Sequence, residues 1–360
     1  MIELTHGDLL KAPVEALVNT VNTEGVMGKG IALQFKKAFP ENYDAYRVAC
    51  ERGEVQPGKV FVYRLQNLTG PKYILNFPTK RHWRERARLD DIAAGLNDLV
   101  NQIDALKIQS VAVPPLGCGH GGLAWKTVYP LIEEALGSLH HIKVMVFEPA
   151  GAPPAGEIVD NTSRPKMTDG RAALLLAIEQ YLATGWQYRL SLLELQKLAY
   201  FLQESGLKLR LKFRPLVYGP YADELRHVLN RIEGHFVVGF ADGKNSPDTP
   251  LEPKPDAVEE ARRFAEGKAK LHKHLNAVAH VIENFETPFG MELLSSVHWI
   301  AHYGVNAPHA GDPDEAFRQL RNWNVHKAQT FRKNHVDLAW AQLEGRGWLP
   351  TKQARPQDHD

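Results

Sequence analysis

Cysteine is almost absent from this sequence, since Cys50 and Cys118 are the only two among 360 residues. Two cysteines cannot form the disulfide framework of a small secreted protein, so we expect a reducing compartment, the cytoplasm. Long apolar runs are also missing, because none approaches the roughly 18 residues that a membrane-spanning helix needs. The first residues have neither the basic nor the apolar region of a secretory signal. We therefore expect no membrane partner.

A charge excess of either sign is missing as well. The formal net charge is +1, so the sequence as a whole does not indicate a protein that binds nucleic acid, and any such surface must be local. We find no internal repeat, no heptad run and no long low-complexity tract. The chain is nevertheless long enough for two domains.

The first part of the chain, residues 1–150, alternates two kinds of segment. Short segments rich in Val, Ile and Leu predict strands at 2–5, 16–20, 59–65, 73–77, 110–114 and 143–147. Segments with helical apolar spacing predict helices at 31–39, 90–104 and 125–136. This alternation predicts an α/β domain with a mixed, mostly parallel sheet between helices.

The composition then changes, which indicates a domain boundary. Residues 151–170 are rich in Pro, Gly and small residues and predict a linker, whereas 171–350 predict a mainly helical second domain. Ser191 and Glu194 form a capping box before a helical apolar face. Further helices are predicted at 222–232, 257–285 and 291–303, a loop at 242–255 and a disordered tail at 351–360.

Two segments near the start of the chain carry polar groups at strand ends. Asp8 follows the first strand, and its carboxylate can accept a hydrogen bond from an adenine amino group; the alternative is an Asp that caps a turn. Residues 19–30 combine Asn19 and Asn22 with glycines before a helix, a pattern that suits an anion at a helix N-terminus. Asn22 can bind a ribose hydroxyl or stabilise its own loop. The spacing matches neither a Walker P-loop nor the dinucleotide-binding fingerprint.

A third segment, residues 114–123, contains four glycines between a strand and a helix that begins near Trp125. Consecutive backbone N–H groups in such a loop form an anion-binding nest. Two glycine loops in one α/β domain favour a ligand with a diphosphate and sugars. Cys118 and His120 are two residues apart within this loop, a spacing that does not orient them as a nucleophile and base.

The fourth segment, residues 77–88, brings a basic run to a strand end. Lys80 lies at the rim of the expected ligand site, and Arg81, Arg84, Arg86 and Arg88 follow it, with Trp83 among them. Basic side chains can hold a phosphate backbone while an aromatic ring stacks a base. The alternative is a solvated basic loop.

In this order, the four segments resemble the macrodomain, an ADP-ribose-binding α/β module. Gly-Asp-Leu at 7–9 is similar to its adenine-contacting segment, Val-Asn-Thr-Val-Asn at 18–22 to its ribose-contacting segment, and residues 117–122 to its phosphate loop. The resemblance implies ADP-ribose contacts at Asp8, Leu9, Thr20, Val21, Asn22, Gly30, Ile31, Thr79, Gly117, Cys118, Gly119, His120 and Gly121.

Two further motifs narrow the resemblance. Thr-Glu-Gly-Val-Met-Gly-Lys-Gly-Ile after Asn22, together with Asn-Phe-Pro-Thr-Lys ending at Lys80, departs from the macrodomains that hydrolyse protein-linked ADP-ribose. The combination resembles the DarG branch of DNA ADP-ribosyl glycohydrolase antitoxins; a related vertebrate branch that acts on proteins also uses a catalytic lysine. Residues 195–202 and 217–225 resemble the helical antitoxin domain called Panacea or SocA-like.

The resemblance implies an antitoxin that removes ADP-ribose from thymine bases of single-stranded DNA. Lys80 would be catalytic, either as an amine that attacks the sugar or as a charge that stabilises the departing base. Arg81, Trp83 and Arg84 would contact DNA, and the second domain would bind a DarT-like transferase toxin. ADP-ribose is the expected ligand and product, and we expect neither a cofactor nor a metal ion. Two alternatives stay open: a non-catalytic ADP-ribose reader, and deacetylation of O-acetyl-ADP-ribose.

Overall fold

The computed structural model describes residues 2–350 except for 68, 150, 152, 154–156, 184–189 and 241–246. The chain divides into two compact units, with the division at Ser163 and Arg164. Asn161 of the predicted linker packs on the first unit, because its N and Nδ2 donate to the carbonyl oxygens of Lys37 and Ala38 at 2.8 Å each. The predicted tail at 351–360 lies outside the described residues, and the boundaries at 150 and 170 stay predictions.

The first unit is built on a sheet of six strands. These are β1 (Ile2–Thr5), β2 (Ala16–Asn22), β3 (Phe61–Arg64), β4 (Tyr73–Lys80), β5 (Ser110–Val113) and β6 (Lys143–Phe147). Their order is β1-β6-β5-β2-β4-β3, and every pair is parallel except the antiparallel pair of β3 and β4. The expected mixed, mostly parallel sheet is confirmed.

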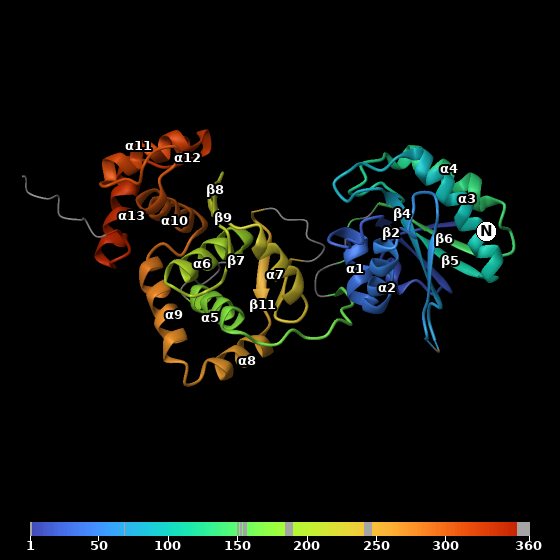
Figure 1. The fold of residues 1–360 in the computed structure, drawn as a ribbon, viewed down its shortest axis with the longest axis horizontal. Helices are drawn as coiled ribbons and strands as arrows, with labels where there is room; N and C mark the ends of the chain where they lie inside the picture. The colour runs from blue at the N-terminus through green and yellow to red at the C-terminus, as the bar shows by residue number, and fades with distance from the viewer. Residues whose placement is uncertain are drawn as a thin grey trace, which may run out of the picture. The chain divides into compact units, whose positions relative to one another are not determined.

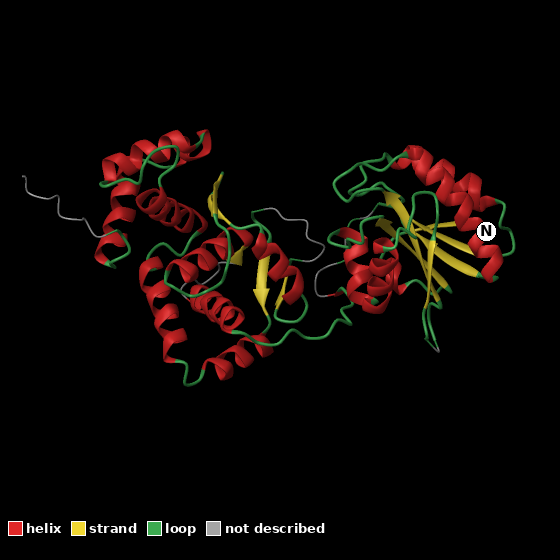
Figure 2. Ribbon diagram, in the orientation of Figure 1, coloured by secondary structure: helices red, strands yellow, loops and turns green. Residues whose placement is uncertain are grey.

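Helices cover both faces of this sheet, as Figures 1 and 2 show. They are α1 (Gly30–Ala38), α2 (Pro40–Glu51), α3 (Leu89–Leu106) and α4 (Trp125–Gly137), and a short 3-10 helix, η1, spans Leu9–Lys11. Successive side chains of a strand point to opposite faces. Val18 of β2 therefore packs in the cluster with α3 and α4, whereas Leu17 packs with Phe35 of α1.

An amide network joins β2, β4 and α2 within the first unit. Asn19 and Asn76 are register partners, and Asn19 Nδ2 donates to Asn76 Oδ1 at 2.9 Å. Asn76 Nδ2 in turn donates to Asn42 Oδ1 of α2 at 2.8 Å. All three side chains are buried. Because a buried amide is stable only when hydrogen-bonded, the network fixes how these three elements meet.

The second unit is mainly helical, as predicted. Its helices are α5 (Asp169–Ala183), α6 (Leu192–Glu204), α7 (Glu224–Ile232), α8 (Pro255–Ala265), α9 (Ala269–Ile282), α10 (Pro288–Tyr303), α11 (Pro313–Trp323), α12 (Val325–Thr330) and α13 (Lys333–Gly345). Short strands complete it: β7 (Leu190–Ser191), β8 (Arg214–Leu216), β9 (Gly219–Tyr221), β10 (Val237–Val238) and β11 (Pro250–Pro253). Helices α6 and α10 pack together near its centre. Among the described residues, no helix is both long and apolar enough to cross a membrane.

Some predicted elements are confirmed and others need correction. The capping box is present, with Ser191 N donating to Glu194 Oε2 at 2.7 Å and Glu194 N donating to Ser191 Oγ at 3.4 Å. The single helix predicted at 257–285 is wrong, because it is interrupted at Gly267, which has a φ of +73°. The loop predicted at 242–255 is wrong in its second half, where β11 forms; residues 242–246 lie outside the described residues.

Candidate functional site

Three loops meet beyond the carboxyl ends of adjacent strands β5, β2 and β4, the edge where open α/β sheets bind ligands. The loops after β2 and β4 are joined by Thr23, whose N and Oγ1 donate to the Arg81 carbonyl at 3.3 and 2.5 Å. The loops after β4 and β5 are joined by Ala87 N, which donates to Gly121 O at 3.0 Å. The segments that the sequence singled out at 19–30, 77–88 and 114–123 therefore form one continuous site.

Lys80 is the last residue of β4 and lies where these loops converge. Its Nζ donates a hydrogen bond to the backbone carbonyl of His120, in the glycine loop after β5. The side chain is half-buried, and burial lowers the pKa of Lys80 because the charged amine loses solvation. Thr79 beside it is buried, and its Oγ1 donates to Val21 O at 3.4 Å. A lysine with a lowered pKa where three loops converge suits nucleophilic or proton-transfer chemistry.

Asn22 ends β2 and uses its amide to shape the loop that follows. Its Oδ1 accepts from Glu24 N at 2.9 Å, from Val26 N at 3.3 Å and from Tyr46 Oη at 3.2 Å. Its Nδ2 donates to Val26 O at 2.6 Å. The oxygen is thus fully engaged, and one amide N–H remains for a ribose hydroxyl. Tyr46, which the sequence analysis missed because α2 was not predicted, is the partner that fixes this amide.

The glycine loop after β5 is shaped by close backbone approaches. A Cβ at Gly121 would lie 2.3 Å from the Gly117 carbonyl oxygen, so only glycine fits there. At Gly119, by contrast, a Cβ would meet no atom within 4 Å. The His120 ring reaches across to α1, since its Cδ2 lies 3.3 Å from the position of a Cβ on Gly30. The loop and the N-terminus of α1 are therefore adjacent, an arrangement in which backbone N–H groups of both segments can bind a diphosphate.

Cys118 in the same loop is not an activated nucleophile. Burial raises the pKa of Cys118 to about 11, so the thiol is protonated at neutral pH. Its Sγ donates to Leu116 O at 3.5 Å rather than to His120. The geometry agrees with the expectation from sequence that these two residues do not form a catalytic pair.

The segment expected to contact adenine lies on the α1 face of the sheet. Asp8 caps η1, since its Oδ1 accepts from Leu10 N at 3.0 Å, and its Oδ2 lies 3.6 Å from Lys11 Nζ. Leu9 is buried in the cluster that Ile31 of α1 packs against. The capping role left open from sequence is thus present, and η1 lies beside the start of α1. Contact of Asp8 with adenine stays a prediction.

The other residues expected to contact ADP-ribose differ in how far their side chains are buried. Val21 is buried in a cluster with Met27 and Tyr46, so only its backbone can face a ligand. Thr20 and Ile31 are half-buried at the same end of the first unit. Each of these contacts stays a prediction.

The basic loop after β4 divides into a paired residue and an exposed pair. Arg81 forms two hydrogen bonds to Asp91 in the first turn of α3, from Nη2 at 3.0 Å and from Nε at 3.3 Å. Trp83 is 46% exposed, and the Arg84 guanidinium lies 4.5 Å from its ring centroid. The ring of His82 stacks on Trp83 at a centroid distance of 5.5 Å. Trp83 and Arg84 are therefore presented to solvent, whereas Arg81 fixes the loop. DNA contact by each of the three stays a prediction.

Comparison with known proteins agrees with this geometry. Residues 18–132 match the Macro domain family. The chain is 58% identical to the structure of the macrodomain of Thermus aquaticus DarG, which covers 41% of this chain and 99% of that one with a TM-score of 0.40. It is 49% identical to a DNA ADP-ribosyl glycohydrolase of Thermus aquaticus, over 97% of this chain and 94% of that protein.

The chain belongs to the DarG family of DNA ADP-ribosyl glycohydrolases. A DNA ADP-ribosyl transferase-DNA ADP-ribosyl glycohydrolase fusion protein of Thermosipho africanus is 36% identical, over 41% of this chain and 42% of the fusion. Within the described residues, no group of three or more His, Cys, Asp and Glu side chains is placed to hold a metal ion.

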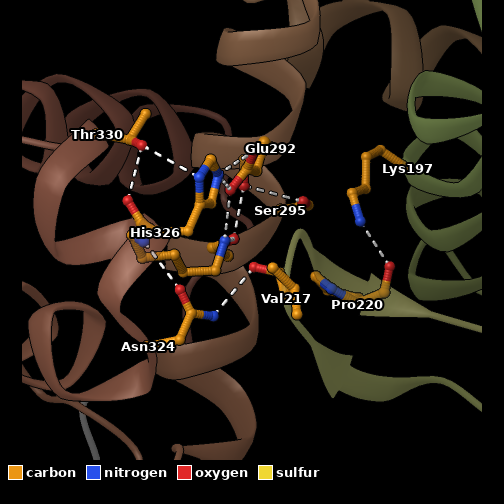
Figure 3. Close-up of polar contacts among 10 residues, drawn as sticks. Lys197, Val217, Pro220, Glu292, Ser295, Asn324, His326 and Thr330 are labelled. Atoms are coloured by element: carbon orange, nitrogen blue, oxygen red, sulfur yellow. Dashed lines mark hydrogen bonds and ion pairs between the residues drawn. The ribbon is translucent and has the colours of Figure 1, made fainter. Parts of the chain in front are cut away.

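In this DarG-family chain, the two motifs that resemble a helical antitoxin domain contact each other. Figure 3 shows Lys197 of α6 directed at the Pro220 carbonyl of β9, to which its Nζ donates at 2.7 Å. Gln196 exchanges two hydrogen bonds with the backbone of Ala222, at 3.1 and 3.0 Å. Burial, together with the positive charge of Lys327, lowers the pKa of Lys197 to about 7.

Strands β8 and β9 form a hairpin, which contains Pro220, and contacts around α12 hold this hairpin from a second side. Lys327 Nζ donates to Glu292 Oε1 at 2.9 Å and to Ser296 Oγ at 2.8 Å. Asn324 Nδ2 donates to the Val217 carbonyl at 3.1 Å (Figure 3). The hairpin is thus fixed from α6 on one side and from α12 on the other. Its tip nevertheless exposes three large side chains, Leu216, Val217 and Tyr218.

Proposed function

We propose that the first unit of this protein hydrolyses the N-glycosidic bond between ADP-ribose and a base, thymine, in single-stranded DNA. The bond from the ribose C1″ to the base nitrogen would break, the water hydroxyl would join C1″, and the base would regain its proton. The unmodified base would remain in the strand, and ADP-ribose would leave as product. The position of Lys80 carries this proposal, because Lys80 is the register partner of Asn22 and its amine contacts the glycine loop.

Each part of the site would have a separate task. The glycine loop and the start of α1 would bind the diphosphate through backbone N–H groups. The remaining amide N–H of Asn22 would bind a hydroxyl of the distal ribose, and Asp8 would face the adenine. Trp83 and Arg84 would hold the DNA strand next to the modified base.

Lys80 would act on the ribose C1″ that Asn22 orients. A neutral amine would attack C1″ and displace the base, which would take up the proton that the amine gives up. Opening of the ribose C1″–O bond, with transfer of the second amine proton to the ring oxygen, would give a Schiff base, and water would hydrolyse it to ADP-ribose and free Lys80. A charged amine would instead stabilise the departing base. Burial of Lys80 supports the first route, because it lowers the pKa and so raises the neutral fraction.

The second unit would bind and neutralise a DarT-like DNA ADP-ribosyltransferase toxin. Support comes from the Thermosipho africanus protein, whose name joins a transferase and a glycohydrolase in one chain. Neutralisation by binding would not need catalysis. A Lys80→Ala variant should therefore still co-purify with a co-expressed DarT toxin and should protect cells from it at least in part, whereas failure to co-purify would contradict this role.

The decisive experiment uses single-stranded oligonucleotides that carry ADP-ribose on one base type at a time. We expect the wild type to release ADP-ribose from the thymidine adduct, as measured by chromatography of the free nucleotide. A protein that binds ADP-ribose but releases none from any oligonucleotide would be a reader rather than an enzyme. Release of ADP-ribose from a different base alone would support the proposed hydrolysis but show that the substrate base is not thymine.

A further inference from the structure

In the second unit, basic and apolar residues alternate along the chain between α6 and the end of β8. Lys208, Arg210, Lys212 and Arg214 are all exposed, and we call them the basic stripe. The residues between them point inward: Leu211 is buried, and Leu207, Leu209 and Phe213 pack against the core. The alternation therefore directs four cationic side chains to solvent from one short stretch of chain.

The backbone under the basic stripe is held in place. Gln203 of α6 binds both polar groups of Leu211, donating from Nε2 to its carbonyl at 2.9 Å and accepting from its N–H at 2.8 Å. Arg214 is paired in register with Tyr221 of β9. Arg210 has a φ of +60°, in the left-handed region that favours glycine. The backbone conformation at this position therefore disfavours an arginine.

Little negative charge offsets the basic stripe. In the part of the chain that the structure describes, Lys208, Arg210 and Lys212 have no ion pair or hydrogen bond, and Arg214 alone pairs, with Asp223. Three other exposed arginines of this unit do pair with carboxylates, in the pairs Arg164–Glu260, Arg262–Glu179 and Arg346–Glu283. Glu204, the last residue of α6, precedes the basic stripe in the sequence, and its carboxylate accepts from Tyr303 Oη at 2.9 Å. In a chain with a net charge of +1, this is a local excess of positive charge.

An aromatic platform follows the basic stripe directly. Tyr218, at the tip of the hairpin of β8 and β9, is 39% exposed. Its ring packs edge-on against His326 of α12 at a centroid distance of 5.0 Å, which fixes it. Cationic side chains in sequence with an exposed aromatic ring are the combination that binds single strands, since phosphates meet the charges and bases stack on the ring.

We propose that the basic stripe and Tyr218 form a second binding site for single-stranded DNA, on the helical unit of this protein. This proposal rests on the proposed function, which makes single-stranded DNA the carrier of the substrate. A second contact on the same strand raises the effective concentration of the strand at the protein. The basic stripe would therefore lower the KM for modified DNA and leave the chemical step unchanged.

A DNA occupant fits the charge of the basic stripe better than a toxin does. A transferase that modifies DNA must itself present positive charge to the phosphate backbone. Two positive surfaces repel, so a DNA-binding face of the toxin is a poor partner for this row of cations. The phosphate backbone is the complementary polyanion.

The test measures binding of the full-length protein to an unmodified thymidine oligonucleotide by fluorescence anisotropy at several salt concentrations. We expect Lys208→Ala/Lys212→Ala to weaken binding on the order of tenfold at low salt and to lower the slope of log affinity against log salt by about 1.4, at ~0.7 per phosphate contact. The double variant Lys270→Ala/Lys273→Ala removes two exposed lysines of α9 and should leave both quantities unchanged.

Arg210→Gly gives an independent test in which weaker DNA binding cannot be attributed to unfolding of the protein. Glycine accepts the left-handed backbone, so this variant should unfold at the same or a higher temperature while it binds DNA more weakly. On ADP-ribosylated DNA, the stripe variants should raise KM and keep kcat.

Failure of the wild type to release ADP-ribose would contradict the proposed function, whereas wild-type release with unchanged DNA affinity in the stripe variants would overturn this inference alone. Loss of DarT co-purification without loss of DNA binding would show a protein-binding face instead and would also overturn it.

Discussion

Lys80 and Asn22 are register partners at the carboxyl ends of the neighbouring parallel strands β4 and β2. The pairing shifts by one residue between Val21 and Asn22, which makes Lys80 rather than Thr79 the register partner of Asn22. A residue that can orient a sugar and a residue that can react with it thus end adjacent strands.

Replacement of Lys80 should separate binding from chemistry. We expect Lys80→Ala to keep ADP-ribose affinity within roughly tenfold, about 1.4 kcal/mol, by calorimetry. Release of ADP-ribose from modified DNA should fall by on the order of a hundredfold or more, because the reacting group is gone. Wild-type turnover by this variant would place the catalytic group elsewhere.

The charge state of Lys80 should control the pH profile. Since burial lowers its pKa, we expect single-turnover rates to rise with pH up to that pKa and then to level, as the neutral amine accumulates. Lys80→Arg should be inactive on this route, because a guanidinium stays charged. A rate that falls with rising pH, together with an active Lys80→Arg, would assign the electrostatic role. Borohydride trapping of a protein–sugar adduct would support the covalent one.

Gly119 allows a test of the diphosphate site that leaves the loop intact. A Cβ at this position meets open space, so Gly119→Ala should bind ADP-ribose much as the wild type does. Gly119→Glu should abolish detectable binding in calorimetry, because a carboxylate would repel the diphosphate. Equal affinity of both variants would mean that the ligand binds elsewhere. Unfolding temperatures near that of the wild type would confirm that both variants fold.

Arg84 and Arg81 should differ although both belong to the basic run. Arg84→Ala should weaken binding of modified DNA, most strongly at low salt, and leave binding of free ADP-ribose unchanged. Arg81→Ala should lower the unfolding temperature, because it leaves the carboxylate of Asp91 without its partner. The contrast fails if Arg81→Ala is as stable as Arg84→Ala in thermal unfolding.

Lys197 should make the stability of the second unit depend on pH. Its pKa is about 7 in the folded chain against 10.5 when exposed, so the unfolded state binds the extra proton between these values. Stability should therefore rise with pH from about 7 toward 10. In Lys197→Met the rise should be smaller by an amount on the order of a few kcal/mol. Urea unfolding of both proteins at pH 7 and 9.5 measures this difference. An equal increase in the free energy of unfolding between the two pH values for both proteins would contradict burial of a titrating lysine.

Local patterns predicted most of the first unit. The strands and the helices that alternate with them were visible because each is short, apolar and bounded by turn residues. Helix α2 was missed because Pro40 was interpreted as the end of the preceding helix. In the structure it is the first residue of the next one, a position where the absent N–H of proline costs nothing.

The partners of side chains were harder to predict than their positions. Arg81 lies in a basic run, and nothing in that run shows that a carboxylate ten residues later binds it. The signal was an Asp in the first turn of a predicted helix, which became informative once β4 was known to end beside α3. Likewise, the three donors to Asn22 Oδ1 include Tyr46 from an element that the sequence analysis lacked.

The buried amides of Asn19 and Asn76 bear on how the chain avoids misfolding. Strands β2 and β4 are mostly apolar, and a slip of two residues would keep every side chain on its correct face. Such a slip would separate the two amides and leave the buried amide of Asn19 without its partner, which is unfavourable. It would also carry Lys80 roughly 6.6 Å along the strand from Asn22, at 3.3 Å per residue. The contact that disfavours slipped strand pairings is therefore also one that keeps Lys80 in register with Asn22.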